Sequence, residues 1–373
     1  MRFRPLLLCT FISCLGGAFI ACSGSGGGSS TPIATPTATP TPTPTPTATP
    51  APTPLPKSSV SGLAMPGTGS EAAPAGTGCN LSVLNWAGFS GAASYSFDDG
   101  QPSHIAHWPE LKATGVPMTF YIYPSLSTLA NYETTWKDAM ASGCEIGNHS
   151  GTHKAISEYS GASASAQDIV QCSDYIENVL GQTTPCSFAY PNGDLTWEPS
   201  LNGKFLFART INSGTIKPLD GTKPLELPIY FAQAGQTESD FNPVLDQSAS
   251  EKSWVIFMFH SLLPGDNWYA AVNCTSVVKS INHGVGNGNL WMDTVERVGA
   301  YWMAQKLFAT IQPQGDATSK TWTWTLPQRF PQGQYLRVRV DGGTLSQGGV
   351  VLPWNAHGFY EIALDAGSLS WQQ

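Results

Sequence analysis

Short apolar runs that stop abruptly at polar residues recur through the middle of the chain. Residues 93–97 run directly into Asp98 and Asp99, and residues 254–259 are apolar throughout and stop at His260. Such runs are typical of buried strands, and an uninterrupted apolar run predicts a strand that is buried on both faces. The expected strands are residues 93–97, 118–123, 145–147, 187–190 and 254–259.

Helical spacing of apolar residues appears between several of these strands. Ile169, Cys172 and Ile176 recur at this spacing, and Asp293 with Glu296 forms a capping-box pattern at the start of another helix. Alternating strands and helices predict an α/β fold with a parallel sheet or barrel. Because polar residues follow the carboxyl end of each strand, we expect them to share one face, where barrels place their chemistry. The expected helices are residues 126–142, 165–180 and 293–311.

The pattern changes after the last of these helices. Trp322, Trp324 and Leu326 alternate with threonines, and further short runs in this stretch have strand-like patterns. Residues 315–373 are therefore expected to form a small all-β appendage. A tryptophan stripe of this kind can stack on sugar rings or pack against the barrel, and packing is the commoner use.

The N-terminus has the pattern of an export signal. Arg2 and Arg4 precede an apolar stretch over residues 6–20, which is too short for a comfortable membrane span. The stretch ends at Cys22 in a sequence that resembles a bacterial lipoprotein signal, in which this cysteine is acylated; ordinary secretion with cleavage nearby is the alternative. We expect residues 1–22 to be a signal sequence and the protein to be exported. It would be lipid-anchored to the bacterial cell envelope or cell surface, or else secreted.

A long segment of low complexity follows the signal. Residues 23–30 are rich in Ser and Gly, residues 31–56 form a Thr-Pro tract, and residues 57–78 continue with Gly, Ala and Ser. This composition does not support a core, and the Pro-rich part favours an extended polyproline II conformation. We expect residues 23–78 to be a disordered linker that tethers a catalytic domain at residues 79–314.

Composition narrows the classes of partner. Charged residues make up 12% of the chain, and 18 Lys and Arg against 26 Asp and Glu give a net charge of −8. So few cations exclude a phosphate-neutralising face for nucleic acid. The 12 Trp, 12 Tyr and 16 Phe suit uncharged sugars better than charged partners. We expect a monomer whose only membrane contact is the lipid anchor at Cys22.

The cysteines that follow the signal are odd in number, so at least one of them has no disulfide partner. Cys172 lies on an expected helix and Cys186 opens the following strand. We expect these two to pair and to close a loop of about 15 residues. The chain has no CxxC spacing, which argues against a structural zinc site built from thiolates.

Polar residues at the strand ends carry the candidate chemistry. His149 and His153 are four residues apart, a spacing that brings two imidazoles to one face of a helical turn and is common in metal chelation. With one carboxylate of the Asp98-Asp99 doublet they form a set suited to a catalytic divalent ion such as Zn²⁺. The second acid can then accept a proton from the water that the metal activates. His260 has no metal partner near it in the sequence and suits a general acid that protonates a leaving group.

Four stretches resemble, in order, motifs of the NodB-homology polysaccharide deacetylases, which form carbohydrate esterase family 4. The stretches are SFDDG at residues 96–100, HSGTH at 149–153, FAYPNG at 188–193 and FMFH at 257–260. The resemblance covers roughly residues 90–310. It implies a distorted (β/α) barrel and metal-dependent removal of acetyl groups from polysaccharides. By position it makes Asp99, His149 and His153 the metal ligands, Asp98 the catalytic base and His260 the acid.

The third motif departs from the family pattern. Many members have an Arg that orients the catalytic Asp where this chain has Ala189, and the aromatic residue usual at Asn192 is missing. Arg209, at the end of a neighbouring expected strand, could supply the missing charge. The resemblance makes the backbone amide of Asn192 an oxyanion donor. Tyr190 and Trp291 are candidate pocket walls, although core packing suits each of them equally well.

Three functions remain open. The first, which we expect, is a hydrolase that releases acetate from N-acetylhexosamine polymers such as chitin, chitooligosaccharides or peptidoglycan. Its cofactor would be zinc, with cobalt or nickel as alternatives. The second is the same site acting on O-acetyl esters, for example in acetylated xylan. The third is a tethered carbohydrate-binding protein without turnover, but binding alone does not need three metal ligands and a separate acid. The sequence contains no Gly-x-Ser-x-Gly elbow of a serine esterase and no phosphate-binding loop, which argues against these other kinds of chemistry.

Overall fold

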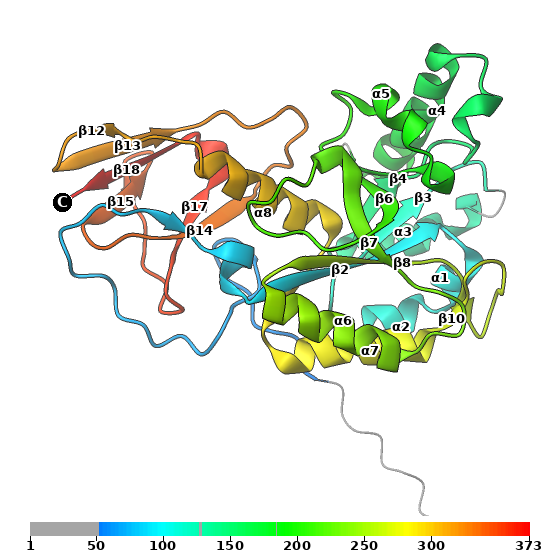
Figure 1. Ribbon diagram of the computed structural model, residues 1–373, viewed down its shortest axis with the longest axis horizontal. Coiled ribbons are helices and arrows are strands. Elements are labelled where there is room, and N and C mark those ends of the chain that lie inside the picture. Colours follow the sequence, from blue (N-terminus) through cyan, green and yellow to red (C-terminus); the bar gives the residue numbers. More distant parts are fainter. Residues whose placement is uncertain (1–51, 127–128, 184) are drawn as a thin grey trace, which may run out of the picture. The chain divides into compact units, whose positions relative to one another are not determined.

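The computed structural model describes residues 52–126, 129–183 and 185–373 (Figure 1). The expected signal sequence, the expected acylation site at Cys22 and the first part of the expected linker lie outside the described residues. Within the described part of the chain, no helix is long and apolar enough to cross a membrane.

Seven parallel strands, β2 to β8, form a closed barrel. They pair in chain order, and β2 (Gly91–Asp99) also pairs with β8 (Trp254–Phe259), which closes the ring. An eighth strand, β11 (Leu290–Met292), pairs with the first residues of β2. The α/β fold predicted from the sequence pattern and the barrel implied by the family resemblance are therefore both confirmed. The remaining barrel strands are β3 (Thr119–Ile122), β4 (Glu145–Asn148), β5 (Ser187–Ala189), β6 (Phe207–Ser213) and β7 (Leu227–Phe231).

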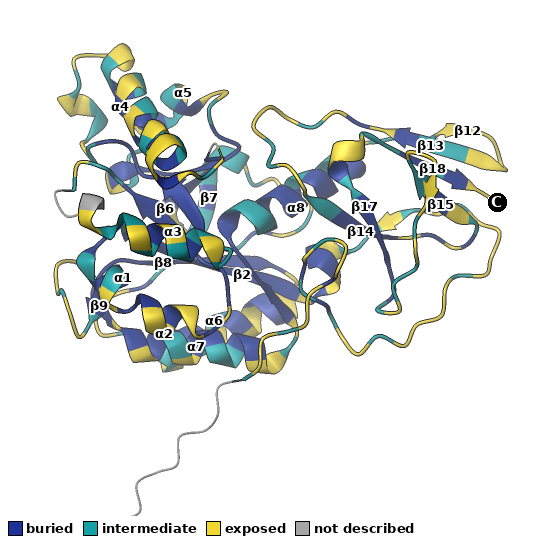
Figure 2. Ribbon diagram, turned by 180° about the vertical axis from the view of Figure 1, so that it is seen from behind, coloured by how far each residue is buried: buried dark blue, intermediate teal, exposed yellow. Residues whose placement is uncertain are grey.

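Helices surround the barrel (Figure 1). Two of them, α6 (Glu238–Glu251) and α7 (Cys274–Asn287), lie side by side, and each has a buried and an exposed face (Figure 2). The helix expected at residues 165–180 is α4 (Ala162–Asp174), which continues as a π-helical turn through Leu180. The other helices are α1 (Pro102–Ala106), α2 (Trp108–Lys112), α3 (Glu133–Ala141), α5 (Glu198–Leu201) and α8 (Val295–Phe308).

The last helix, α8, has a different N-cap from the predicted one. The Thr294 hydroxyl accepts a hydrogen bond of 3.1 Å from the Arg297 amide, and an Asp293 carboxylate oxygen accepts one of 2.9 Å from the Thr294 amide. The predicted capping box of Asp293 with Glu296 is therefore wrong. The Glu296 amide instead donates to the buried Glu145 carboxylate over 2.9 Å, which satisfies another free N–H group at the start of the helix.

The barrel strands are buried on both faces because a core cluster lies on either side of the sheet. In β8, Val255, Phe257 and Phe259 belong to the cluster shared with the outer helices, whereas Trp254 and Ile256 belong to the other cluster. This arrangement explains the uninterrupted apolar run in the sequence.

Two antiparallel sheets follow the barrel, as the alternating pattern predicted. Trp322 and Trp324 are buried in the core shared with α8, and the Trp324 ring lies 4.9 Å from the Phe308 ring. The tryptophan stripe is therefore used for packing. One sheet takes in β1 (Ser82–Val83) from upstream of the barrel, so the appendage is not built from the C-terminal residues alone. This sheet is completed by β14 (Tyr335–Arg339) and β17 (Tyr360–Ala363). The other contains β12 (Gln314–Gly315), β13 (Ser319–Thr323), β18 (Ser368–Gln372), β15 (Thr344–Gln347) and β16 (Val350–Val351).

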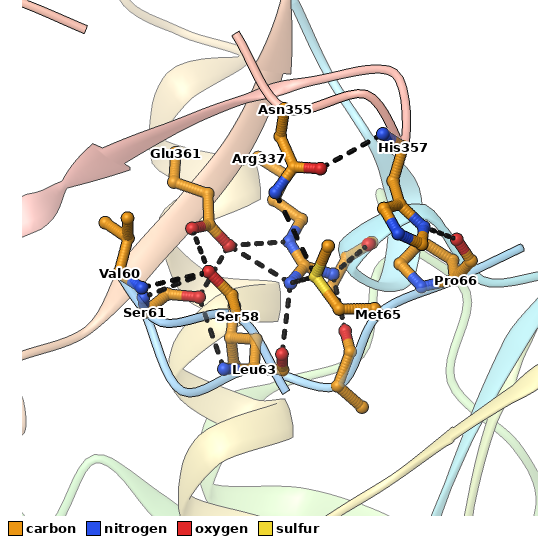
Figure 3. Close-up of polar contacts among 12 residues, drawn as sticks. Ser58, Val60, Ser61, Leu63, Met65, Pro66, Arg337, Asn355, His357 and Glu361 are labelled. Carbon is orange, nitrogen blue, oxygen red and sulfur yellow. Dashed lines mark hydrogen bonds and ion pairs between the residues drawn. The ribbon is translucent and has the colours of Figure 1, made fainter. Parts of the chain in front are cut away.

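Residues 57–66, which we call the strap, pack against this appendage (Figure 3). Ser58 and Leu63 are buried, and the Arg337 guanidinium donates a hydrogen bond of 2.7 Å to the Ala64 carbonyl. The structure of this segment differs from the disordered linker expected to reach residue 78. The physical reason is that the strap buries apolar side chains and satisfies donors of a buried guanidinium, which composition alone does not reveal.

All five cysteines in the described part of the chain are free, so the predicted Cys172–Cys186 disulfide is wrong. The Cys172 thiol donates to the Ile122 carbonyl over 3.2 Å in the outer core cluster, whereas Cys186 belongs to the cluster on the other side of the sheet. Closeness along the chain did not bring the two sulfurs to the same face of the sheet.

Candidate functional site

Polar side chains at the carboxyl ends of the barrel strands converge on one cleft of about 480 Å³. This is the face on which parallel barrels place their chemistry. The whole expected catalytic set lines this cleft, namely Asp98, Asp99, His149, His153 and His260.

Asp98 and Asp99 both reach the cleft because β2 ends at Asp99 and the chain turns there. Neighbouring residues of a regular strand point to opposite faces. Asp99 has a φ of 74° and Gly100 a φ of 63°, so the chain turns in the left-handed region immediately after Asp98. Both carboxylates line the cleft as a result.

The two histidines lie on a loop after β4, and the predicted helical turn is wrong. Ser150 and His153 have φ values of 66° and 55°, and the Ser150 hydroxyl accepts a hydrogen bond of 2.9 Å from the His153 amide. Asp168 on α4 accepts the Gly151 amide over 2.8 Å. The loop still brings the imidazoles of His149 and His153 together, with ring centroids 4.6 Å apart.

Asp99, His149 and His153 form a set of three ligand atoms that fits a divalent cation. Asp99 Oδ1 is 3.5 Å from Nε2 of each histidine. Ligands about 2.1 Å from a tetrahedral ion are about 3.4 Å apart, which agrees with these separations. His149 Nδ1 donates to the Ala189 carbonyl over 2.8 Å, and this bond directs the lone pair of Nε2 towards the cleft.

The protonation of this set also suits a cation. Burial opposes ionisation of Asp99, but a hydrogen bond and the charge of His149, together with the charge of His153, hold the pKa of Asp99 well below its usual value. Burial and the neighbouring His149 lower the pKa of His153 to about 4. At neutral pH the set therefore offers a carboxylate and an uncharged His153 imidazole.

Asp98 is paired with Arg209, a contact of residues far apart in the sequence. Arg209 lies on β6, is 1% exposed, and its guanidinium donates to Asp98 Oδ1. Burial alone would raise the pKa of Asp98, but the charge of Arg209, with those of His149 and His260, lowers it. The prediction that Arg209 supplies the charge missing at Ala189 is consistent with this geometry.

His260 follows β8 and faces the second oxygen of Asp98. Its Nε2 is 3.9 Å from Asp98 Oδ2. Two aromatic rings hold the imidazole: the Tyr269 ring is perpendicular to it with centroids 4.9 Å apart, and the Phe231 centroid is 5.5 Å away. Its Nδ1 is buried and has no hydrogen-bond partner among the described residues. Burial lowers the pKa of His260 although Asp98 and Asp99 act to raise it, so the ring favours the neutral state.

The remaining predicted site residues divide into two groups. Tyr190 and Asn192 line the cleft, and the Tyr190 hydroxyl donates to the Leu225 carbonyl over 2.9 Å. Trp291 is fully buried on β11, its ring 5.3 Å from that of Tyr301, and it does not line the cleft. Its prediction as a pocket wall is wrong because β11 directs the indole into the core shared with α8.

Several cleft residues were not predicted from the sequence. Gln101 donates to Asp99 Oδ2 over 3.1 Å, and Tyr123 packs with its ring centroid 5.1 Å from that of His153. Trp268 and Tyr269 come from the loop after β8. A sequence signal existed only for Trp268 and Tyr269, which are two adjacent large aromatic residues in an otherwise polar loop that contains Gly and Pro.

A known protein family matches the first half of the barrel sequence. Residues 90–201 match the family model described as polysaccharide deacetylase. This match confirms the resemblance over the first three motifs, which hold the Asp98-Asp99 doublet and both histidines of the HSGTH stretch, and it ends before the FMFH stretch at residues 257–260. No curated protein matches the chain.

Three solved structures illustrate the similarity of this chain to known proteins. A putative polysaccharide deacetylase from Mycobacterium smegmatis is 16% identical, with a TM-score of 0.45, and the match covers 64% of this chain and 96% of that one. A probable polysaccharide deacetylase from Pseudomonas aeruginosa PAO1 is 14% identical, with a TM-score of 0.48 and coverage of 60% and 94%. A family 4 carbohydrate esterase from Streptomyces lividans is 17% identical, with a TM-score of 0.37 and coverage of 55% and 92%.

Proposed function

We propose that this protein is a metal-dependent hydrolase that removes N-acetyl groups from N-acetylhexosamine polymers such as chitin, chitooligosaccharides or peptidoglycan. The observation that carries the proposal is the convergence of Asp99, His149 and His153 on one point, with an unshared oxygen of Asp98 beside them. A site that only binds saccharide has no need of this combination.

The metal would be held by Asp99, His149 and His153. Zinc is the cation that this ligand set suits best, with cobalt or nickel as alternatives. When bound, such an ion would polarise the acetyl carbonyl and make a water molecule more acidic. The backbone amide of Asn192, which belongs to a residue lining the cleft, is the proposed additional donor to the developing oxyanion.

Asp98 and His260 would move the proton. Asp98 Oδ1 is held by Arg209, so Oδ2 is the oxygen available to accept a proton from the attacking water. Oδ2 is 3.9 Å from His260 Nε2, which is beyond direct hydrogen-bond distance, so this proton would pass to the neutral imidazole through one bridging water molecule. The imidazolium then gives a proton to the leaving nitrogen as the carbon–nitrogen bond breaks, which restores both groups.

The nature of the leaving group favours amide hydrolysis over ester hydrolysis. An amine is a poor leaving group unless its nitrogen is protonated, whereas an alcohol leaves more readily. A dedicated acid at His260 is therefore needed more for an N-acetyl than for an O-acetyl substrate. The O-acetyl esterase acting on acetylated xylan remains the second candidate, because the same metal ligands and base serve both reactions.

We also propose that the protein works outside the cytoplasm, as a monomer that reaches its polymer from a lipid anchor at Cys22. The apolar stretch and the Pro-rich tract at the N-terminus support this proposal. Labelling with a radioactive fatty acid tests the anchor, and we expect the label to be lost in a Cys22→Ala variant.

Acetate release with and without a chelator tests the proposed function. We expect acetate from chitin oligomers or peptidoglycan, loss of this activity after chelation, and recovery on addition of zinc or cobalt. Acetylated xylan is included to compare ester with amide hydrolysis. Full activity after verified removal of the metal would refute the mechanism, and a rate on acetylated xylan that exceeds every N-acetyl substrate would favour the esterase.

A further inference from the structure

One wall of the cleft carries an exposed aromatic pair. The loop between β9 (Leu262–Leu263) and β10 (Val272–Asn273) presents Trp268 and Tyr269, whose exposed fractions are 65% and 55%. No other aromatic side chain in the described part of the chain is as exposed to solvent as these two. Both line the catalytic cleft. Exposure of a large aromatic side chain in such a position indicates a binding surface.

The loop that presents this pair is held at several points. The Ser261 amide donates to the Tyr269 carbonyl over 3.3 Å, and the Tyr269 amide donates to the Ser261 hydroxyl over 3.1 Å. On the other side of the loop, Asp266 accepts the Ser103 amide over 3.0 Å. These hydrogen bonds fix the backbone beside Trp268, so ligand binding would cost little conformational entropy in this loop.

The two aromatic rings have different surroundings. The Tyr269 ring packs perpendicular to the His260 ring, and its centroid lies 6.1 Å from that of Phe231. Tyr269 is therefore used to hold the His260 imidazole in place. Trp268, one residue away, belongs to no such stack among the described residues and is the more exposed of the two. Its indole is therefore free to contact a ligand that occupies the cleft.

The chemistry of the cleft limits what that ligand can be. No lysine or arginine is among the described residues that line it. Ile211, which is 45% exposed, lines the cleft as well and adds an apolar surface. A ligand that combines an apolar ring face with uncharged polar edges fits these surroundings, and a pyranose ring is such a ligand. An indole suits it because the ring offers a flat apolar face and one N–H donor.

We propose that Trp268 stacks on a pyranose ring next to the acetylated sugar, so that the enzyme prefers oligosaccharides over a single acetylated unit. This inference rests on the proposed deacetylase function, because that function places the acetylated sugar at the metal ligands. Trp268 would then be a specificity-determining residue that acts on binding of the neighbouring sugar.

Binding measured without turnover tests the stacking directly. In the full-length protein carrying Asp98→Asn, titration calorimetry with N-acetylchitotetraose compares Trp268 with Trp268→Ala and Trp268→Phe. We expect Trp268→Ala to weaken binding roughly three- to tenfold, as for loss of one aromatic contact, and Trp268→Phe to retain most of the affinity. Val350→Ala removes an equally exposed apolar side chain from the appendage and serves as the matched control.

Kinetics on substrates of different length provide the second readout. In the enzyme with Asp98 intact, Trp268→Ala should raise KM for the tetramer several-fold more than KM for the monosaccharide. Equal affinity of the Trp268→Ala and parent proteins for the tetramer, with no length-dependent change in KM, would overturn the inference. Absence of acetate release from every substrate would refute the proposed function instead, and the calorimetric comparison would still decide whether Trp268 binds saccharide.

Discussion

Two buried pairs of arginine and carboxylate lie in different parts of this molecule. Asp98 and Arg209 meet at the cleft, and Glu361 and Arg337 meet beneath the strap in the appendage. The four side chains are almost completely buried in both places. The pairs differ in how completely their remaining donors and acceptors are satisfied.

The pair in the appendage is saturated with hydrogen bonds (Figure 3). Arg337 donates to Glu361 over 3.1 Å and to the carbonyls of Leu63, Ala64 and Ala87. Both oxygens of Glu361 also accept hydroxyl groups of the strap, from Ser58 and Ser61. No oxygen of this carboxylate is left for chemistry.

The pair at the cleft is incompletely satisfied. Arg209 holds Asp98 Oδ1, but its Nε has no partner among the described residues, and its other terminal nitrogen faces the Met258 sulfur at 2.8 Å. Asp98 Oδ2 has imidazole nitrogens of His149 and His260 at 3.9 Å, which is beyond hydrogen-bond distance. The same kind of ion pair therefore uses both carboxylate oxygens in the appendage and leaves one carboxylate oxygen at the cleft without a hydrogen-bond partner among the described residues.

The largest effect is expected from the open oxygen. Asp98→Asn should lower the rate of acetate release by about a thousandfold or more, because the amide cannot accept the proton of water. Metal content should be retained, since Asp99, His149 and His153 are unchanged. Acetate release and metal analysis on the same preparation measure both properties.

Two matched variants sharpen this comparison. Glu361→Gln changes the saturated carboxylate in the same way and should leave the rate of the folded protein within about twofold. Arg209→Ala should lower the rate roughly a hundredfold, because Asp98 loses the cation that holds it. A wild-type rate for Asp98→Asn would refute the assignment of the base, and a wild-type rate for Arg209→Ala would refute the positioning role.

The next effect concerns stability. Arg337→Ala should lower the free energy of unfolding by about 3–5 kcal/mol, because it leaves the Glu361 charge buried without its cation. Arg339 lies on the same strand as Arg337 and forms a partly exposed ion pair with Glu71. Arg339→Ala should lower the free energy of unfolding by about 1 kcal/mol or less. Urea unfolding compares the two, and similar losses would contradict a special role for the buried pair.

Truncation of the chain tests the contact between the strap and Arg337. Removing residues 1–51 should leave the unfolding midpoint unchanged. Removing residues 1–66 should lower it, because the Leu63 side chain and two of the three carbonyls that accept hydrogen bonds from Arg337 are lost. Equal stability of the two truncated proteins would show that the strap does not contribute to the fold.

A pH-dependent effect is expected at a carboxylate that lacks a saturating cation. Burial and the neighbouring Glu145 raise the pKa of Glu296 to about 8. Between its unfolded value near 4.5 and about 8 the folded protein binds more protons, so stability falls as pH rises through this window. Glu296→Gln should make the unfolding free energy less dependent on pH between 5 and 8. Glu251→Gln, on the exposed end of α6, is the control, and an unchanged slope in Glu296→Gln would contradict the shift.

Local pattern, together with the resemblance of four stretches to a known family, was sufficient to predict the barrel and most of the polar residues at the carboxyl ends of its strands. A short apolar run such as residues 254–259 favours a buried strand, and the residue after it then lies at the carboxyl end of that strand. Asp98 and Asp99 end β2, and His149 and His260 directly follow β4 and β8, so the convergence of these four residues follows from strand order in a parallel barrel. His153 lies farther along the loop after β4.

Contacts between distant segments were decided only by the tertiary structure. Arg209 reaches Asp98 across 111 positions, and the strap docks on Arg337 from about 270 positions away. The same cause underlies the errors: Trp291 faces the core, and Cys172 and Cys186 lie on opposite sides of a sheet. Periodicity reports which face of its own element a residue occupies, whereas its partner depends on how the elements pack, and that information is not local.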